Sequence, residues 1–386
     1  MKNSDYKIAI VSDPLFKAGG LEKHLKYMLE TFPGSILYTA FCDKKFVKEY
    51  YPGVVVKTSF MQYIPGKFKF RQFLLLLQPL AYKSFRFKDS DIVLSISIAF
   101  AKFVKPKVPH VYICLTPSKY FWEKDGRTLK DANQLKGVNK MLFKFYSFFM
   151  NTFLEDIWKK WDKQAAQRAD KMIAISHAVS DRIKKFYERD SDVMYPPVEV
   201  KEIGEKTKVN RKENWFLYLG RVETYKGVEL AIRAAYDAKV PLKVAGTGED
   251  SERMHMLVKE LNAKGLVKFL GFVSDEEKLK LLSKAKALIF PVRKEDFGIV
   301  PVEANAAGTP VIAYAQGGVL ETISKSNPKT GIFFKKYEVE SLSKILKTFD
   351  SKDYNPQNCK KNAENFAVEI FKYKLRTYIE DVLQSK

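Results

Sequence analysis

The second half of the chain alternates short apolar runs with segments of helical periodicity, and this alternation restricts the possible folds more than any other feature. The apolar runs cover 215–219, 242–245, 267–270, 287–290 and 311–315. The helical segments between them cover 228–238, 251–262, 275–284 and 301–307. Ser274 and Glu277 have the spacing of a capping box before the third helical segment. This order predicts an α/β fold with a parallel sheet that helices cover on both faces.

The first half repeats the pattern with longer, aromatic-rich insertions. Its expected strands cover 7–12, 35–39, 91–97, 110–115 and 171–176. A length of 386 residues suits two domains, so we expect two parallel-sheet domains with a ligand site between them at the carboxyl ends of the strands.

A segment rich in proline and charge supplies the expected domain boundary. The predicted N-terminal domain covers 1–199, the linker 200–214 and the C-terminal domain 215–365. A helical stretch closes the chain at roughly 356–384, and its part at about 366–386 is expected to pack back on the first domain.

Composition excludes several classes of protein. With 46% hydrophobic and 29% charged residues, the chain is neither disordered nor membrane-spanning. The start of the sequence does not resemble a signal peptide, and the three cysteines are odd in number and widely spaced, which suits a reducing cytoplasm. No histidine pairs with a cysteine at metal-ligand spacing. We therefore expect a cytoplasmic location and no metal.

The segment GRVETYKG, residues 220–227, follows an expected strand and opens a helix. Arg221 and Lys226 bring two cations to a helix start, where unpaired N–H groups and the helix dipole favour an anion. A pyrophosphate fits such a site, although ordinary surface cations at a helix start explain this motif equally well.

Two carboxylates follow the strand at 287–290. Glu295 lies in a loop, where it can accept hydrogen bonds from sugar hydroxyls or stabilise positive charge at an anomeric carbon. Glu303 is expected in the first turn of the next helix and can hold a ribose diol. The simpler alternative is a surface charge at Glu295 and an acid that complements the helix dipole at Glu303.

These residues match a known family. The chain resembles the retaining glycosyltransferases of the GT-B fold, family 4 (glycosyl transferases group 1), which carry two glutamates separated by seven residues. Glu295 and Glu303 have this spacing inside EDFGIVPVEANAAGTPVIAYAQGGVLET, and the resemblance extends through GRVETYKG, AGTGED and LGFVSDEEKLKLLSKAKALIFP. In the first half, AGGLE, ICLTPSKYFW and 159–199 look like the branch that contains mannosyltransferases of surface-polysaccharide assembly.

The resemblance implies a role for each matching residue. Two Rossmann-like domains would face a central cleft, with Arg221 and Lys226 on the donor diphosphate, Glu303 on the ribose and Glu295 on the transferred sugar. It implies further donor contacts from one group of backbone amides and from two glycines of the first domain. These residues are Phe297, Gly298, Ile299 and Val300, together with Gly19 and Gly20. The family uses a nucleotide-diphosphate sugar and needs no metal or other cofactor.

One position departs from the family pattern. Leu115 stands where the related branch carries a histidine that contacts the donor sugar near its C6 hydroxyl. A leucine cannot donate a hydrogen bond, and an unpaired buried hydroxyl costs about 1–3 kcal/mol. Leu115 is therefore consistent with a donor that lacks this hydroxyl, such as a 6-deoxyhexose like rhamnose. It is also consistent with an ordinary hexose such as mannose whose hydroxyl another residue holds, and with reduced activity.

Positive charge gathers in one part of the chain. The net charge is +22, and residues 51–150 carry 17 Lys and Arg against 5 Asp and Glu, a difference of +12. Basic and aromatic residues interleave there, as in KFKFR at 67–71. The pattern suits an anionic membrane surface, nucleic acid or a solvated face over an aromatic core.

The sequence thus predicts retaining transfer of a hexose to a lipid-linked or polysaccharide acceptor in cell-surface glycan synthesis. We expect the protein at the inner face of the membrane, and no nucleic-acid partner. Two alternatives remain, a catalytically silent protein that binds sugar nucleotides and a basic nucleic-acid-binding protein. A catalytically silent protein that binds sugar nucleotides would fit Leu115. A nucleic-acid-binding protein would use the charge of +22 but gives no reason for the spacing of Glu295 and Glu303.

Overall fold

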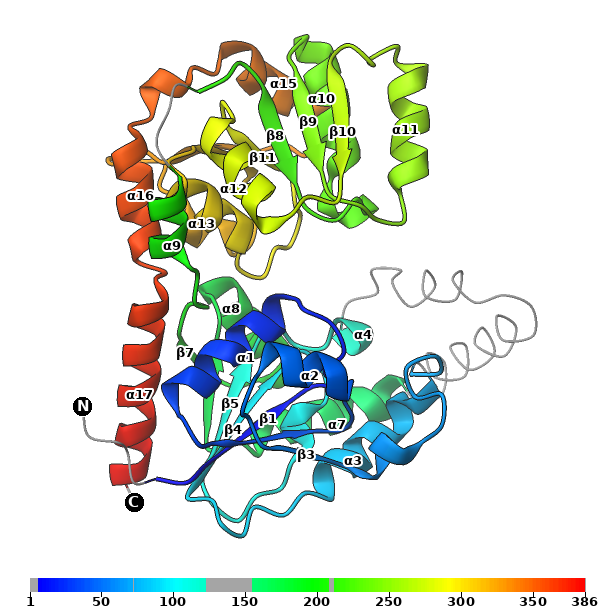
Figure 1. Ribbon diagram of the computed structural model, residues 1–386, viewed down its shortest axis with the longest axis vertical. Helices are drawn as coiled ribbons and strands as arrows, with labels where there is room; N and C mark the ends of the chain where they lie inside the picture. Colours follow the sequence, from blue (N-terminus) through cyan, green and yellow to red (C-terminus); the bar gives the residue numbers. More distant parts are fainter. Residues whose placement is uncertain (1–5, 72, 123–154, 208–211, 386) are drawn as a thin grey trace. The chain divides into compact units, whose positions relative to one another are not determined.

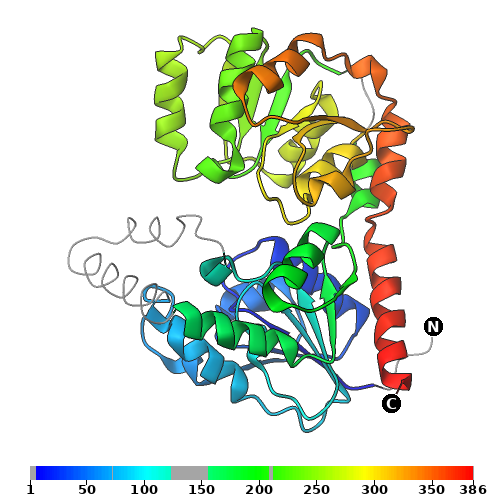
Figure 2. The ribbon, with the colours of Figure 1, turned by 180° about the vertical axis from the view of Figure 1, so that it is seen from behind.

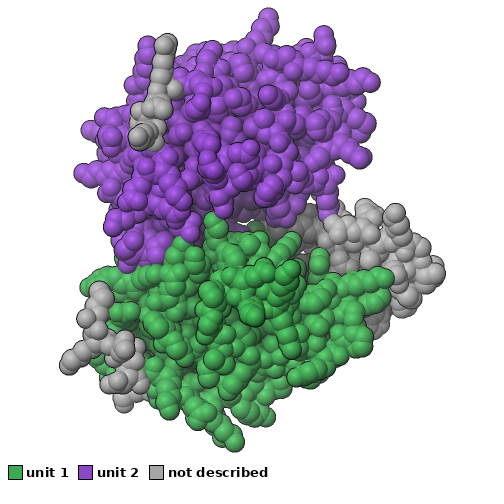
Figure 3. All heavy atoms as spheres, in the orientation of Figure 1, with its two compact units in different colours: residues 1–194, 372–386 green, residues 195–371 purple. Residues whose placement is uncertain are grey.

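The structure is a computed structural model that describes residues 6–71, 73–122, 155–207 and 212–385. The chain forms two compact units, shown in different colours in Figure 3. Unit 1 comprises Met1–Met194 with Lys372–Lys386, and unit 2 comprises Tyr195–Phe371. Each unit is built around one parallel sheet.

The sheet of unit 1 has the strand order β3-β2-β1-β4-β5-β6-β7, and all its pairs are parallel. Its strands are β1 (Ile8–Ser12), β2 (Ile36–Thr39), β3 (Val56–Thr58), β4 (Ile92–Ser97), β5 (His110–Cys114), β6 (Lys171–Ala174) and β7 (Asp192–Val193). The five strands expected from the sequence are confirmed. The two edge strands β3 and β7 are too short to produce a readable apolar pattern.

Helices cover the strands of unit 1 (Figures 1 and 2). They are α1 (Gly20–Thr31), α2 (Lys44–Tyr50), α3 (Gln78–Lys83), α4 (Lys119–Trp122), α7 (Glu155–Gln167) and α8 (His177–Tyr187), with the 3₁₀ turns η1 (Phe60–Tyr63), η2 (Phe73–Leu77) and η3 (Ala101–Phe103). Both figures show α3 next to α7, and Lys83 of α3 lies 5.9 Å from the ring centroid of Trp161 in α7. Buried aromatics, including Tyr82, Phe103 and Trp158, pack against β1 and β4 beneath these helices.

The sheet of unit 2 has the order β10-β9-β8-β11-β12-β13 and is also parallel throughout. Its strands are β8 (Phe216–Leu219), β9 (Leu242–Ala245), β10 (Val267–Gly271), β11 (Leu288–Phe290), β12 (Val311–Tyr314) and β13 (Gly331–Phe334). The five expected strands are again confirmed. The edge strand β13 adds a sixth.

The helices of unit 2 follow the predicted alternation. They are α9 (Val200–Lys206), η4 (Thr224–Lys226), α10 (Val228–Ala238), α11 (Ser251–Glu260), α12 (Asp275–Lys284), α13 (Ile299–Ala306), α14 (Val319–Thr322), α15 (Val339–Thr348), η5 (Ser351–Asp353) and α16 (Pro356–Glu364). The predicted capping box is confirmed, since Ser274 accepts from the Glu277 amide while Glu277 accepts from that of Ser274.

The structure divides the predicted linker and the predicted C-terminal helical stretch into separate elements. Residues 200–206 of the expected linker form α9, which packs on α13 and α16 inside unit 2. The final helical stretch consists of α16 and α17 (Val368–Gln384). Lys372 of α17 lies 2.5 Å from the Glu30 carboxylate, and Arg376 donates to the carbonyl of Thr31, so the later part of α17 contacts the end of α1.

Both sheets have one topological switch point. In unit 1 it lies between β1 and β4, and in unit 2 between β8 and β11, because the strand order reverses direction there. Ligands of open parallel sheets bind at the carboxyl ends of strands beside such a point. A ligand site of unit 2 is therefore expected at the loops after β8 and β11.

Candidate active site

The loops after β8 and β11 are joined by an ion pair. The Lys226 ammonium, at the end of η4, donates to the Glu295 carboxylate at 3.1 Å, and both side chains are about one-fifth exposed. Burial disfavours the charged ammonium, but Glu295 and the hydroxyl of Tyr225 outweigh it and raise the pKa of Lys226. The lysine therefore stays cationic at the switch point.

Arg221 lies in the same loop but has different partners. It donates to Glu223 at 2.7 Å and to the hydroxyl of Tyr225, and its side chain is 63% exposed. The ring centroid of Tyr225 lies 5.7 Å from the Arg221 guanidinium carbon and 5.2 Å from the Lys226 nitrogen. The structure thus places both predicted cations around Tyr225, a residue that the sequence analysis did not single out.

Two glycines of the QGG segment hold the loop that carries Glu295. The Gly318 amide donates to the Glu295 carbonyl at 2.9 Å, and Glu295 and Gly317 form a parallel bridge. A Cβ on Gly317 would lie 2.5 Å from the Glu295 carbonyl oxygen, and one on Gly318 would lie 2.5 Å from that of Asp296. Glycine is therefore needed at both positions for this close approach.

The four amides predicted to bind the donor lie at the start of α13. Gly298 is the N-cap with φ 101°, and as a glycine it has no side chain that could cap this helix end. Phe297 is 2% exposed and packs on Tyr195 and Phe366, with ring centroids 5.6 and 5.4 Å away. The amides of Ile299 and Val300 belong to the first turn, where N–H groups have no acceptor within the helix.

Glu303 occupies the second turn of α13, because the helix begins at Ile299 rather than near Pro301 as expected. Its carboxylate accepts a hydrogen bond from the Lys278 ammonium at 3.0 Å, and Glu303 is 7% exposed. Burial opposes the charge on Lys278, yet Glu303 and Asp275 raise the pKa of the lysine. The role of Glu303 as an acid that complements the start of the helix is thereby disfavoured. Lys278 lies 25 residues before Glu303, and no motif in the sequence indicates that the two side chains form a pair.

The AGTGED turn supports the Arg221 loop. The Val222 amide donates to the Thr247 carbonyl at 3.0 Å. A Cβ on Gly246 would lie 2.0 Å from the Gly220 carbonyl oxygen, and one on Gly248 would lie 2.2 Å from that of Val222. The turn precedes α11, which agrees with its interpretation as a glycine turn before a helix.

In unit 1, the predicted glycines form the start of α1. Gly19 is the N-cap, Gly20 is the first helical residue, and both are exposed. The Glu22 carboxylate folds back over them, since a Cβ on Gly19 would lie 2.9 Å from Glu22 Oε2. Burial, with a contribution from Asp13, raises the pKa of Glu22 to about 7.

Leu115 follows β5 and is 8% exposed. Its amide donates to the Ser97 carbonyl at 3.2 Å. The adjacent Thr116 hydroxyl accepts a hydrogen bond from Arg182 of α8 at 3.1 Å. Leu115 is thus a buried apolar side chain, and the guanidinium of Arg182 contacts the neighbouring Thr116.

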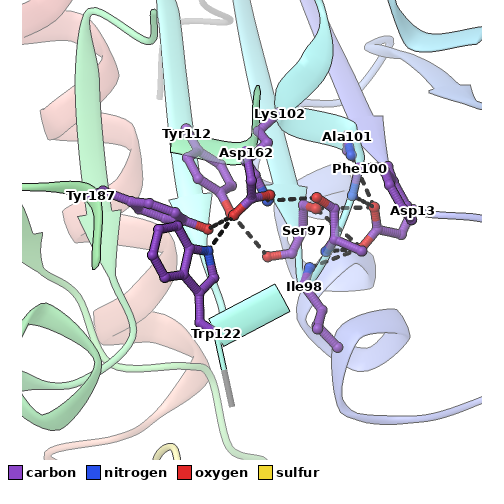
Figure 4. Close-up of polar contacts among 11 residues, drawn as sticks. Asp13, Ser97, Ile98, Phe100, Ala101, Lys102, Tyr112, Trp122, Asp162 and Tyr187 are labelled. Atoms are coloured by element: carbon purple, nitrogen blue, oxygen red, sulfur yellow. Dashed lines mark hydrogen bonds and ion pairs between the residues drawn. The ribbon is translucent and has the colours of Figure 1, made fainter. Parts of the chain in front are cut away.

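Two aspartates organise the switch point of unit 1 (Figure 4). Asp13, after β1, accepts hydrogen bonds from the Ser97 hydroxyl and from the amides of the four residues that follow β4, at 2.8–3.1 Å. Asp162 of α7 pairs with Lys102 at 2.7 Å, and neither side chain is exposed. Asp162 also accepts from Tyr187 and from Trp122, both at 2.8 Å. One carboxylate therefore ties η3, α4, α7 and α8 together.

The described part of the chain offers neither a cluster of metal ligands nor a membrane span. Among residues 6–71, 73–122, 155–207 and 212–385, no group of three or more His, Cys, Asp or Glu side chains could hold a metal ion, so a metal-free donor site stays a prediction. Within the same described residues, none of the helices has the length and apolar character required to span a bilayer.

Parts of the chain are similar in sequence to known proteins. Residues 199–366 match the family model described as glycosyl transferases group 1. Over 172 residues the chain is 31% identical to the O-antigen chain mannosyltransferase RfbU of Salmonella typhimurium, covering 43% of this chain and 48% of that protein. Over 187 residues it is 27% identical to the D-rhamnosyltransferase WbpZ of Pseudomonas aeruginosa, covering 45% of each. The chain spans less than half the length of these curated relatives.

The similarity in fold to a solved structure covers much more of the chain than the similarity in sequence to these relatives. The solved structure of the lipopolysaccharide outer core galactosyltransferase WaaB, in its apo form, matches with a TM-score of 0.69 and 18% identity, covering 97% of this chain and 99% of that one. This similarity shows that the two parallel sheets have the fold of that protein, and the predicted GT-B fold class is confirmed.

Proposed function

Because the chain belongs to the glycosyl transferases group 1 through residues 199–366, we propose that it transfers a hexose from a nucleotide-diphosphate sugar to an acceptor hydroxyl. The anomeric configuration is retained. The bond from the anomeric carbon to the diphosphate breaks while the bond to the acceptor oxygen forms on the same face, and the acceptor proton passes to the departing phosphate oxygen. No metal takes part.

The ion pair of Lys226 and Glu295 at the switch point of unit 2 carries this proposal. Lys226 and the exposed Arg221 neutralise the departing diphosphate, because charge develops there as the sugar leaves. Glu295 contacts the transferred sugar, and Glu303 holds the ribose. The amides at the start of α13 add donors for sugar hydroxyls or phosphate.

The donor sugar is proposed to be a 6-deoxyhexose such as rhamnose, with mannose as the competing hexose. Leu115 supports this choice, because a buried leucine offers no hydrogen bond to a C6 hydroxyl. Both sugars occur in the names of the two relatives, of which one is a mannosyltransferase and the other a D-rhamnosyltransferase.

A panel of donors tests the sugar preference. We expect faster transfer from deoxysugar nucleotides than from GDP-mannose. We also expect Leu115→His to move the ratio of kcat/KM towards GDP-mannose by about ten-fold, the size of one buried hydrogen bond. Leu115→Met serves as the control that keeps an apolar side chain. A clear preference of the unaltered protein for GDP-mannose would remove the 6-deoxy assignment.

The acceptor is proposed to be a lipid-linked or polysaccharide glycan, with the protein attached to the inner face of the membrane. The support is the basic aromatic insertion, defined as residues 60–88 between β3 and β4, which contains six Lys and Arg and no Asp or Glu. Phe60, Tyr63 and Leu80 in this segment are exposed by 48%, 83% and 56%. Exposed apolar side chains in a segment of positive charge suit the interface of an anionic bilayer.

Sedimentation with vesicles tests the attachment. The protein is expected to bind phosphatidylglycerol vesicles at low salt and to be released at high salt. It should bind phosphatidylcholine vesicles poorly, since each cation near an anionic surface contributes about 1 kcal/mol. The double variant Tyr63→Ser with Leu80→Ser should weaken binding about ten-fold, because less apolar surface is buried.

Tyr373→Ser is the matched control for the vesicle experiment. Tyr373 is 72% exposed on α17, outside the basic aromatic insertion, so this variant should bind as the unaltered protein does. Equal binding to neutral and anionic vesicles, or no binding at low salt, would contradict membrane attachment.

A further inference from the structure

An exposed aromatic side chain stands at the ligand edge of unit 2 and has no role in the function proposed above. Phe272 follows the last residue of β10 and is 83% exposed, more than any other large hydrophobic side chain among the described residues of this unit. Exposing a phenylalanine ring in water is unfavourable. The ring also stands at the carboxyl end of a parallel strand, the edge at which such sheets bind ligands.

Hydrogen bonds link Gly271, the residue before Phe272, through the turn at Gly246 to the loop that carries Arg221. The Gly271 carbonyl accepts from the Gly246 amide at 2.7 Å. The turn that begins at Gly246 lies directly against 220–222, as the Val222 amide bond to Thr247 shows. The loops after β8, β9 and β10 therefore lie side by side, and Phe272 belongs to the same edge as Arg221.

The residues after Phe272 include Lys278, which pairs with Glu303, the carboxylate proposed to hold the ribose. Ser274 caps α12, and Lys278 in the second turn of that helix pairs with Glu303 at 3.0 Å. Residues 271–278 thus run from the turn that contacts the Arg221 loop to Lys278, which forms the ion pair with Glu303. In a nucleoside diphosphate the ribose joins the phosphates to the base, so a group for the base is expected near the ribose carboxylate.

We propose that Phe272 stacks on the nucleobase of the donor. This inference rests on the proposed function, because it extends the same nucleotide site. A phenyl ring offers a flat apolar face, and stacking on it tolerates any base, since every base has a π-face. Phe272 thus contributes affinity for the nucleoside without selecting one base.

Binding of nucleoside diphosphates and of inorganic pyrophosphate to the full chain separates base contacts from phosphate contacts. UDP, GDP, ADP and dTDP are titrated by calorimetry, and the tightest binder is then compared with pyrophosphate. Phe272→Ala is expected to weaken the nucleoside diphosphate about ten-fold, within the range for loss of one base–aromatic stack. It should leave pyrophosphate affinity unchanged. Phe272→Trp should retain nucleotide binding because it keeps an aromatic face, and Tyr373→Ala, an exposed aromatic on α17, is the matched control.

The outcomes distinguish this inference from the proposed function. If UDP, GDP, ADP and dTDP all fail to bind the unaltered protein, both fail together. If a nucleotide binds and Phe272→Ala leaves its affinity unchanged, the stacking role alone is overturned. An equal loss of nucleotide and pyrophosphate binding also overturns it, because the change would then act through the loop rather than through the base.

Discussion

Replacing Lys226 by alanine is expected to lower the kcat for sugar transfer by about 100-fold to 1,000-fold. The ammonium is the less exposed of the two cations at the switch point, and Glu295 holds it at 3.1 Å. Removing one preorganised group that faces developing negative charge has an effect of this size in other enzymes. Glu295 would also lose its neutralising partner beside the donor. Initial rates with the preferred donor of the panel measure the change.

Two controls separate this loss from an effect on folding. Lys280→Ala removes an exposed lysine of α12 that pairs only with the exposed Glu276 in the described contacts, and its kcat should match that of the unaltered protein. Circular dichroism of Lys226→Ala should show unchanged helix content. A fall in kcat of less than ten-fold, with the fold intact, would show that Lys226 does not stabilise the departing diphosphate.

Replacing Asp162 by asparagine is expected to lower the free energy of unfolding of unit 1 by about 3–5 kcal/mol. The change leaves the ammonium of Lys102 charged in a place where neither side chain of the pair is exposed. It also weakens the acceptor of Tyr187 and Trp122 (Figure 4). A buried charge without its partner is among the most costly defects that a single substitution can cause.

Urea unfolding followed by tryptophan fluorescence measures this loss. In a Trp215→Phe background the remaining tryptophans are Trp122, Trp158 and Trp161, so the emission reports on unit 1 alone. Adding Lys102→Met to Asp162→Asn should recover most of the stability, because the buried charge is gone and the asparagine oxygen still accepts a hydrogen bond. If the double variant is as unstable as the single one, the charge of Lys102 is not the cause.

The matched control is Asp190→Asn. Asp190 also pairs with a lysine at 2.7 Å, but the Asp190 and Lys184 side chains are 89% and 63% exposed. Water solvates both groups whether or not they are paired, so no measurable change in unfolding is expected. Comparing the two aspartates isolates the effect of burial from that of the ion pair itself.

The predictions that succeeded rest on short-range patterns. The strands from 216–219 to 311–314 and the helices between them follow apolar periodicity, which a few neighbouring residues set. The Ser274 capping box spans four residues and depends on nothing distant. The spacing of Glu295 and Glu303 was readable for the same reason, and the resemblance to the family rests on such local strings.

The structure differs from the sequence prediction where the apolar pattern of an element is short or where local composition favours another structure. The edge strands β3 and β7 have three and two residues, fewer than a period-2 pattern needs to stand out. Helix α9 lies in a segment whose proline and charge content favours a linker, and its packing on α13 and α16 overrides that preference. The start of α13 at Ile299 follows from Gly298 with its positive φ, while the sequence pointed to the proline two residues later.

By itself, the sequence determined the elements of this protein, their order and the residues that could serve a donor site. Only the tertiary structure decided which groups meet. Lys278 reaches Glu303, Lys226 reaches Glu295 across 69 positions, and Lys102 reaches Asp162 across the gap between η3 and α7. Secondary structure follows from interactions a few residues apart. The partners of a buried charge depend instead on how the strands are ordered in the sheet, and parallel strands bring distant loops to one edge.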